Sequence, residues 1–190
     1  MNTLIVGVDS DIGNAIYNNV PNAICTSRHE NQHAFLDIEM PQATWPTFTN
    51  IDSLYYCIGI AGRGRSSEKV MNVNATRSIE CLDKYANSMN NNGTVYVLSS
   101  IAGSLQFNIP GNVFYKMSKC ALNMGVKELA DKYPSIKWVL IHPGFVDTKM
   151  TRGLALKNAI SPDQSAKGIL ALKAQNNFQF LNVDGSVIPL

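Results

Sequence analysis

A tyrosine and a lysine lie four residues apart in the segment Tyr115-Lys116-Met117-Ser118-Lys119. On a helix such residues share one face, so the Tyr115 phenol and the Lys119 ammonium can converge on one point. An adjacent ammonium favours the ionised phenol and lowers its pKa from the free value of about 10 toward a range useful for acid–base chemistry. The pair can therefore exchange a proton with a substrate oxygen. The alternative is a packed tyrosine beside a solvated lysine, and only the surrounding segments can decide between the two.

Short apolar runs alternate with longer helical stretches along the chain, which is typical of βαβ units and a parallel sheet. Several runs are rich in Val, Ile and Leu without alternation, as expected of strands covered on both faces. The predicted strands are Thr3–Val8, Ala23–Thr26, Ala34–Asp37, Leu54–Ile58, Thr94–Leu98, Lys137–Ile141 and Phe178–Val183. The predicted helices are Ile12–Asn19, Ser67–Met89, Asn112–Lys132 and Pro162–Ala174. The expected fold class is α/β: residues 1–190 form one domain with a Rossmann-like, doubly wound sheet of about seven mostly parallel strands.

The first predicted strand runs into a turn with two glycines, Gly7 and Gly13. In such a turn the glycines let the backbone approach a pyrophosphate, and the following helix supplies N–H donors and the positive end of its dipole. Asp11 occupies the third expected glycine position. Its carboxylate would repel a pyrophosphate, so we expect it to point away, where it can cap the helix. The alternative is an ordinary strand-to-helix turn that needs two glycines.

Composition excludes several function classes. The net charge of +2 comes from scattered residues, which indicates no nucleic-acid partner and no anionic membrane. No apolar run approaches the ~20 residues of a membrane helix, and the apolar start lacks the features of a signal peptide, so we expect a cytoplasmic protein. The four cysteines show no C-x-x-C spacing, and we therefore predict no metal site.

Taken in order, these segments resemble the short-chain dehydrogenase/reductase family. Val6 through Gly13 is similar to the family's glycine-rich turn, and Gly59-Ile60-Ala61-Gly62 is similar to its Asn-Asn-Ala-Gly segment without the asparagines. Tyr115 and Lys119 match the family's Tyr-x-x-x-Lys. Further matches are Asn74, Ser100, Pro143-Gly144 with Thr148, and the ending Phe178–Gly185, which resembles compact members similar to the bacterial C-factor protein.

The resemblance implies hydride transfer between a nicotinamide and a small carbonyl or alcohol substrate. Tyr115 would then be the general acid, Ser100 would hydrogen-bond the reacting oxygen, and Lys119 would lower the Tyr115 pKa and bind the ribose. Asn74 would hold a water that links Lys119 to solvent, which completes the catalytic set Asn74, Ser100, Tyr115 and Lys119. The implied cofactor-binding residues are Gly7, Asp9, Ser10, Ile12, Gly13, Ser27, Arg28, Asp37, Ile38, Gly59, Ile60, Ala61, Tyr115, Lys119, Pro143, Gly144, Phe145, Val146 and Thr148.

The second predicted strand ends in Cys25-Thr26-Ser27-Arg28 and carries no acid to bind a ribose 2′-hydroxyl. This favours NADP(H), although Asp9 can approach the same ribose and keeps NAD(H) possible. Asp37-Ile38 is similar to the family's adenine-contacting pair.

A second hypothesis is a dinucleotide-binding regulatory or scaffold protein with weak or no turnover, which Asp11 and the missing asparagines favour. By the same resemblance we expect a homodimer or homotetramer that pairs through helices 67–89 and 112–132. Cys120, Ala121 and Gly125 would allow close packing of the second of these helices. The lid, about residues 150–160, carries no side chain that identifies the substrate.

Overall fold

A seven-stranded sheet forms the centre of the computed structural model, which describes residues 1–29, 33–154 and 158–190. The strands are β1 (Thr3–Val6), β2 (Ile24–Ser27), β3 (Ala34–Phe35), β4 (Ile51–Tyr56), β5 (Met89–Leu98), β6 (Lys137–His142) and β7 (Phe178–Asn182). Their order in the sheet is β3-β2-β1-β4-β5-β6-β7, and each of these neighbouring pairs is parallel. The order reverses between β1 and β4, and ligands of such sheets bind in the crevice beyond the carboxyl ends of the strands at that point.

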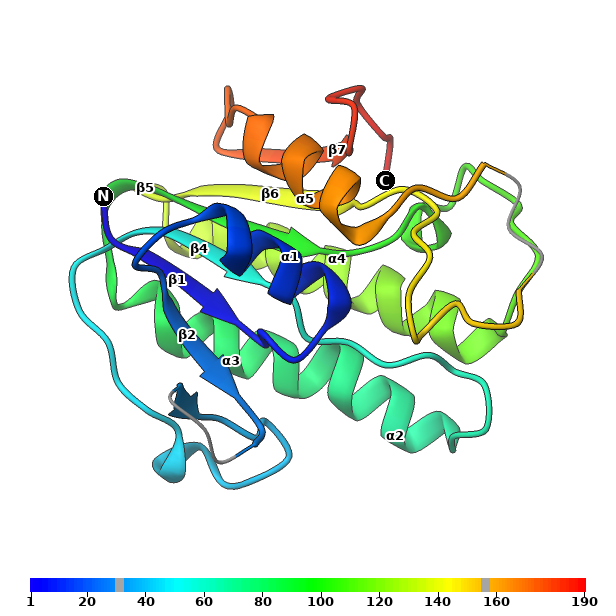
Figure 1. Ribbon diagram of the computed structural model, residues 1–190, viewed down its shortest axis with the longest axis horizontal. Coiled ribbons are helices and arrows are strands. Elements are labelled where there is room, and N and C mark those ends of the chain that lie inside the picture. The colour runs from blue at the N-terminus through cyan, green and yellow to red at the C-terminus, as the bar shows by residue number, and fades with distance from the viewer. Residues whose placement is uncertain (30–32, 155–157) are drawn as a thin grey trace.

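Helices cover both faces of the sheet (Figure 1). On one face lie α1 (Asp11–Asn19) and α5 (Pro162–Ala171), which pack against each other. On the other lie α2 (Ser67–Met71), α3 (Arg77–Ala86) and α4 (Val113–Lys132). Each layer encloses an apolar core, and the fully buried Tyr56 and Trp138 belong to the core on the α3–α4 side. The α/β, Rossmann-like prediction is confirmed, with every described strand pair parallel.

The prediction of one helix over Ser67–Met89 is wrong at two places. A π-helical turn over Asn72–Thr76 separates α2 from α3. The helix also ends at Ala86, and Met89 already belongs to β5, where it pairs with Ile51. The pairing register with β4 shifts between Met89 and Thr94, and Asn92 within this stretch has a φ of +64°. Two short 3₁₀ helices, Gln42–Thr44 and Ile101–Gly103, complete the described elements.

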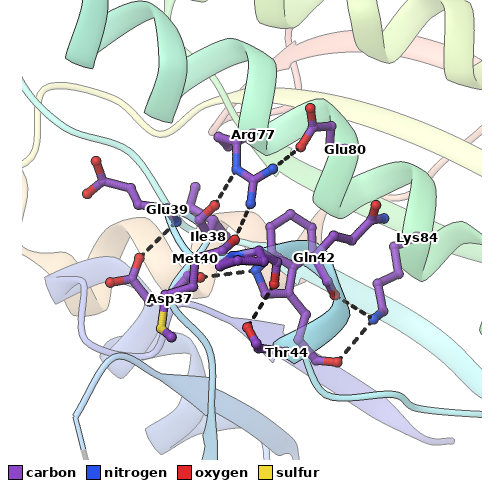
Figure 2. A network of polar contacts seen from close by, with 11 residues as sticks. Asp37, Ile38, Glu39, Met40, Gln42, Thr44, Arg77, Glu80 and Lys84 are labelled. Carbon is purple, nitrogen blue, oxygen red and sulfur yellow. Dashed lines mark hydrogen bonds and ion pairs between the residues drawn. The ribbon is translucent and has the colours of Figure 1, made fainter.

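The segment between β3 and β4 is fixed to α3 by Arg77 (Figure 2). The Arg77 guanidinium donates to the carbonyl oxygens of Ile38 and Met40 and lies 4.6 Å from the centre of the Trp45 ring. The Trp45 indole in turn donates to the Asp37 carbonyl oxygen at 3.0 Å. These contacts hold Asp37 and Ile38, the residues predicted to contact adenine, in place at the edge of the sheet.

Among the described residues, no helix has the length and apolar character that a membrane crossing requires.

Candidate active site

The turn after β1 needs both of its glycines. Gly7 has a φ of +88°, and a Cβ there would lie 2.6 Å from the Ile58 side chain. A Cβ at Gly13 would lie 2.5 Å from the Gly7 carbonyl oxygen. Ser10 caps α1, because its hydroxyl oxygen accepts the Gly13 N–H at 3.0 Å. The expectation that Asp11 caps this helix is therefore wrong, and the Asp11 carboxylate points away from the turn toward Lys149.

A groove of about 230 Å³ begins at this turn and crosses the carboxyl ends of β1, β2 and β4. Eight of the predicted cofactor-binding residues line it: Gly7, Asp9, Ser10, Arg28, Asp37, Ile38, Gly59 and Ile60. Two lining cations, Arg65 and Lys69, were not predicted. Both follow the Gly59–Gly62 segment closely in the chain. The pair of arginines in Arg63-Gly64-Arg65 was the sequence feature that could have indicated a positively charged groove wall. Lys69 pairs with Glu39 at 3.2 Å.

The Asp9 carboxylate is bound to the end of β2. One oxygen accepts the Ser27 hydroxyl at 2.7 Å, and the other accepts the Arg28 backbone N–H at 2.7 Å. Charge-assisted hydrogen bonds of this kind are about twice as strong as neutral ones. They connect the three predicted cofactor residues Asp9, Ser27 and Arg28, and leave the exposed Arg28 side chain at the groove.

Asn74 lies in the π-helical turn and is completely buried. Its side-chain oxygen accepts the Ile60 N–H at 2.8 Å, and its amide nitrogen donates to the Ile60 carbonyl oxygen at 2.9 Å and to the Ser118 hydroxyl at 3.1 Å. Both donors of the side chain are thus used within the protein. π-Helical turns occur frequently at functional sites, and here the turn carries a side chain that binds the loop after β4 through Ile60.

Tyr115 and Lys119 lie one turn apart at the start of α4. Asn112 caps this helix by accepting the Tyr115 N–H at 3.0 Å. Lys119 is 4% exposed, and its ammonium donates to the Leu98 carbonyl oxygen at 3.0 Å. The Lys119 Nζ lies 6.0 Å from the centre of the Tyr115 ring, and a Cβ at Gly59 would lie 3.6 Å from the same Nζ. The structure thus places Lys119, with Tyr115 one turn away, close to Gly59 just beyond the carboxyl end of β4.

The pKa values of this pair differ from the sequence expectation. Burial raises the pKa of the Tyr115 phenol, and a hydrogen bond with Ser100 opposes that rise. Burial also lowers the pKa of Lys119 to about 8. The expectation that Lys119 lowers the Tyr115 pKa is therefore wrong for this arrangement, because loss of solvent disfavours both charged forms.

The segment after β6 carries the last group of predicted residues. Gly144 has a φ of +85°, and the Ser165 hydroxyl donates to the Pro143 carbonyl oxygen at 2.7 Å. The exposed Phe145 lies edge-on to His142, with ring centres 5.6 Å apart. Burial lowers the His142 pKa to about 4, so this ring is neutral at physiological pH. Part of the predicted lid, residues 155–157, lies outside the described residues.

Two of the small residues on α4 contact other parts of the same chain. A Cβ at Gly125 would lie 2.5 Å from the Ile79 side chain of α3, and the Cys120 thiol donates to the Gly103 carbonyl oxygen at 3.2 Å. Their part in a surface for a second subunit stays a prediction. The large apolar side chains exposed on α4 are Val113, Phe114, Met117 and Met124, and the last three share one face of the helix. No group of three or more metal-ligating side chains occurs in the described parts of the chain.

The fold and the glycine-lined groove define a Rossmann-type dinucleotide fold, and comparisons with known proteins identify the family. Residues 39–175 match the family model described as enoyl-(acyl carrier protein) reductase. The chain is 34% identical over 112 residues to an uncharacterized oxidoreductase of Schizosaccharomyces pombe, a match that covers 48% of the chain and 44% of that relative. It is 36% identical over 99 residues to C-signal of Myxococcus xanthus, covering 48% of the chain and 58% of that protein.

Solved structures agree with this fold over the full chain. A Burkholderia multivorans protein described as a short-chain dehydrogenase/reductase with bound NADP has a TM-score of 0.85 at 21% identity, covering 100% of the chain and 99% of its own. NADPH-bound carbonyl reductase from chicken fatty liver has a TM-score of 0.78 at 21% identity, covering 100% and 98%. The chain belongs to the short-chain dehydrogenase/reductase family. Its matches with these two curated relatives span about half of each relative's length.

Proposed function

We propose that this protein is an NADP(H)-preferring oxidoreductase that interconverts a small carbonyl compound and its alcohol, with Tyr115 as the acid and base. The observation that carries the proposal is the placement of Tyr115 and Lys119 one helical turn apart, with the buried Lys119 ammonium 6.0 Å from the centre of the Tyr115 ring and close to Gly59. Membership of the family supports the same reaction class.

The described groove fits a dinucleotide. Gly7 and Gly13 leave the backbone of the first turn free of side chains, and Arg28, Arg65 and Lys69 supply positive charge along the groove. When bound, the nicotinamide supplies the hydride chemistry. The residues that would hold it next to Tyr115 are those after β6, with Thr148 at the carboxamide.

The chain's own residues handle the proton. The raised pKa of Tyr115 keeps the phenol protonated at neutral pH, which is the form that protonates a carbonyl oxygen as it becomes an alkoxide. Ser100 would donate to the same oxygen and fix its position, a type of contact worth ~10²–10³-fold in rate. Lys119, with a pKa of about 8, is poised to return a proton to Tyr115 near neutral pH. Asn74 would act as a positioning residue through Ile60 rather than by holding a water with its donors.

The preference for NADP(H) rests on Arg28 and Asp9. The Asp9 carboxylate that could bind a ribose 2′-hydroxyl already accepts two hydrogen bonds from the end of β2. The Arg28 side chain is exposed at the groove, where an arginine accommodates a 2′-phosphate. NADPH should therefore stabilise the protein to heat more than NADH at equal concentration, and equal stabilisation would remove the preference.

Turnover is tested by NADPH consumption over a panel of ketones, aldehydes and quinones. The proposal expects consumption by the wild-type protein with at least one class. The second candidate, a dinucleotide-binding regulatory protein, is favoured by the missing asparagines of the Gly59–Gly62 segment, and it expects heat stabilisation by NADPH without consumption across the panel.

A further inference from the structure

Asp11, the acid at a position where the family's turn has glycine, makes a specific long-range contact. One carboxylate oxygen accepts the Lys149 backbone N–H at 2.7 Å, and the other lies 3.8 Å from the Lys149 ammonium. Asp11 is the first residue of α1, and Lys149 directly follows Thr148 in the segment after β6. The carboxylate thus joins the phosphate turn to the segment that we propose holds the nicotinamide.

The segment that Asp11 binds is braced internally. The Thr148 N–H donates to the Thr151 hydroxyl at 2.9 Å, and that hydroxyl donates to the Val146 carbonyl oxygen at 2.6 Å. The Asp147 N–H donates to the Ile160 carbonyl oxygen at 3.0 Å, so the turn is also attached at its base. Because the turn is held together in this way, one contact at Lys149 fixes the position of Thr148 relative to α1.

The Asp11 carboxylate is favourably placed at the start of α1. The positive end of the α1 dipole stabilises a carboxylate in the first turn. Ser10 caps the helix, so Asp11 is not needed for that purpose and its side chain, 23% exposed, is directed across to Lys149. A backbone N–H bound to a carboxylate is a charge-assisted hydrogen bond and stronger than a neutral one.

We propose that Asp11 is a positioning residue that clamps the Val146–Thr151 turn onto the phosphate turn and so preorganises the nicotinamide end of the cofactor site. The inference rests on the proposed function for its consequence, cofactor binding, while the clamp itself is a property of the cofactor-free protein. It reverses the simplest expectation, that a carboxylate at this position only weakens binding by repelling a pyrophosphate.

The clamp and the repulsion of a pyrophosphate predict opposite changes in NADPH affinity when Asp11 is replaced. Asp11→Ala and Asp11→Gly remove both the clamp and the negative charge. Asp11→Asn removes the charge but keeps an oxygen that can accept the Lys149 N–H. Asp163→Asn is the matched control, because Asp163 forms a surface ion pair with Lys167 at 2.7 Å and lies outside the groove.

The clamp predicts that Asp11→Ala and Asp11→Gly bind NADPH about tenfold more weakly by isothermal titration, the size of a lost charge-assisted hydrogen bond. Asp11→Asn should stay closer to the wild type than either, and Asp163→Asn should match the wild type. If Asp11→Gly binds NADPH as tightly as the wild type or more tightly, repulsion governs the position and the proposal is wrong.

Hydrogen exchange separates a failed clamp from a failed function. In the cofactor-free protein, the Lys149 amide should exchange faster in Asp11→Ala than in the wild type, and Asp11→Asn should restore the slower rate. This result is expected even if the wild type binds no nicotinamide dinucleotide, a finding that would reject only the proposed function. Unchanged exchange at Lys149 in Asp11→Ala contradicts the clamp itself.

Discussion

The Lys119 ammonium lies 6.0 Å from the centre of the Tyr115 ring, and it donates its hydrogen bond to the Leu98 carbonyl oxygen. Both groups are withdrawn from solvent, and burial shifts their pKa values in opposite directions. It raises the pKa of Tyr115 and lowers that of Lys119 to about 8. The two groups have distinct tasks in the proposed reaction: Tyr115 remains a proton donor at neutral pH, and Lys119 changes its charge near the pH at which the reaction would run.

The rate of carbonyl reduction should depend on pH through Lys119. Lys119 is charged below pH about 8 and loses its proton above that value, so kcat/KM should fall on the alkaline side with an apparent pKa of about 8. Lys119→Met removes the titrating group, so the alkaline fall in kcat/KM should disappear. The overall rate of this variant should be lower than that of the wild type. A limb near pH 8 that persists in Lys119→Met would assign the titration to another group.

The same burial links Lys119 to stability. Because its pKa is about 8 in the folded protein and 10.5 for an ordinary solvated lysine, the unfolded state binds more protons between these pH values. The free energy of unfolding contributed by this group therefore rises with pH from about 8 and levels off above 10.5. Urea denaturation at pH 7.5 and pH 9.5 should show a gain in the wild type relative to Lys119→Met, whereas parallel changes in the two proteins would place the titration elsewhere.

Arg28→Ala should change cofactor preference. Loss of a charge-assisted contact to a 2′-phosphate weakens binding ~10-fold or more, whereas NADH lacks that phosphate and serves as the internal control. Isothermal titration with both cofactors measures the ratio of their dissociation constants, which should move toward NADH. An equal loss for NADH and NADPH would show that Arg28 acts on the groove as a whole.

Asn74→Ala should destabilise the protein because it removes the side chain that binds both polar groups of the Ile60 backbone. It leaves the half-buried Ile60 N–H and carbonyl oxygen without their partner, at a cost of ~1–3 kcal/mol in the free energy of unfolding. Asn18→Ala, at an exposed position of α1, is the control and should change that free energy by about 0.5 kcal/mol or less. Similar denaturation midpoints for the two variants would refute the role of Asn74 in fixing the loop.

The expected oligomer can now be tested at different positions. Phe114, Met117 and Met124 are 41%, 49% and 61% exposed on one face of α4, whereas Gly125 and Cys120 are half-buried against Ile79 and Gly103. Met117→Glu should convert a dimer or tetramer to smaller species in sedimentation velocity, and Met40→Glu, outside α4, should not. A monomeric wild type would end the expectation of assembly through this helix.

The strands were predictable because continuous Val, Ile and Leu runs need two covered faces, and all seven predicted strands occur with ends shifted by a few residues. The π-helical turn was not predictable from the sequence. It places Asn74 against Ile60, and helix propensity carries no information on such a contact between distant segments. The early start of β5 at Met89 likewise depends on Ile51 of a neighbouring strand.

The candidate site was predicted by residue type but not by environment. Tyr115, Lys119 and Ser100 could be named from spacing and resemblance, yet the direction of the Tyr115 pKa shift depends on burial, which the sequence does not state. Arg65 and Lys69 were missed because exposed cations after a glycine-rich loop look like solvated surface, and the partner of Asp11 was missed because Lys149 lies far away in the chain.

The central claim is that the Tyr115 phenol transfers the proton, and Tyr115→Phe tests it most directly. This substitution removes the hydroxyl that interacts with Ser100 and keeps the ring, so NADPH binding measured by titration should be retained. With a carbonyl substrate that the wild type reduces, NADPH consumption should fall by ~10²-fold or more, the scale of general acid catalysis. Equal rates in Tyr115→Phe and the wild type would contradict the account.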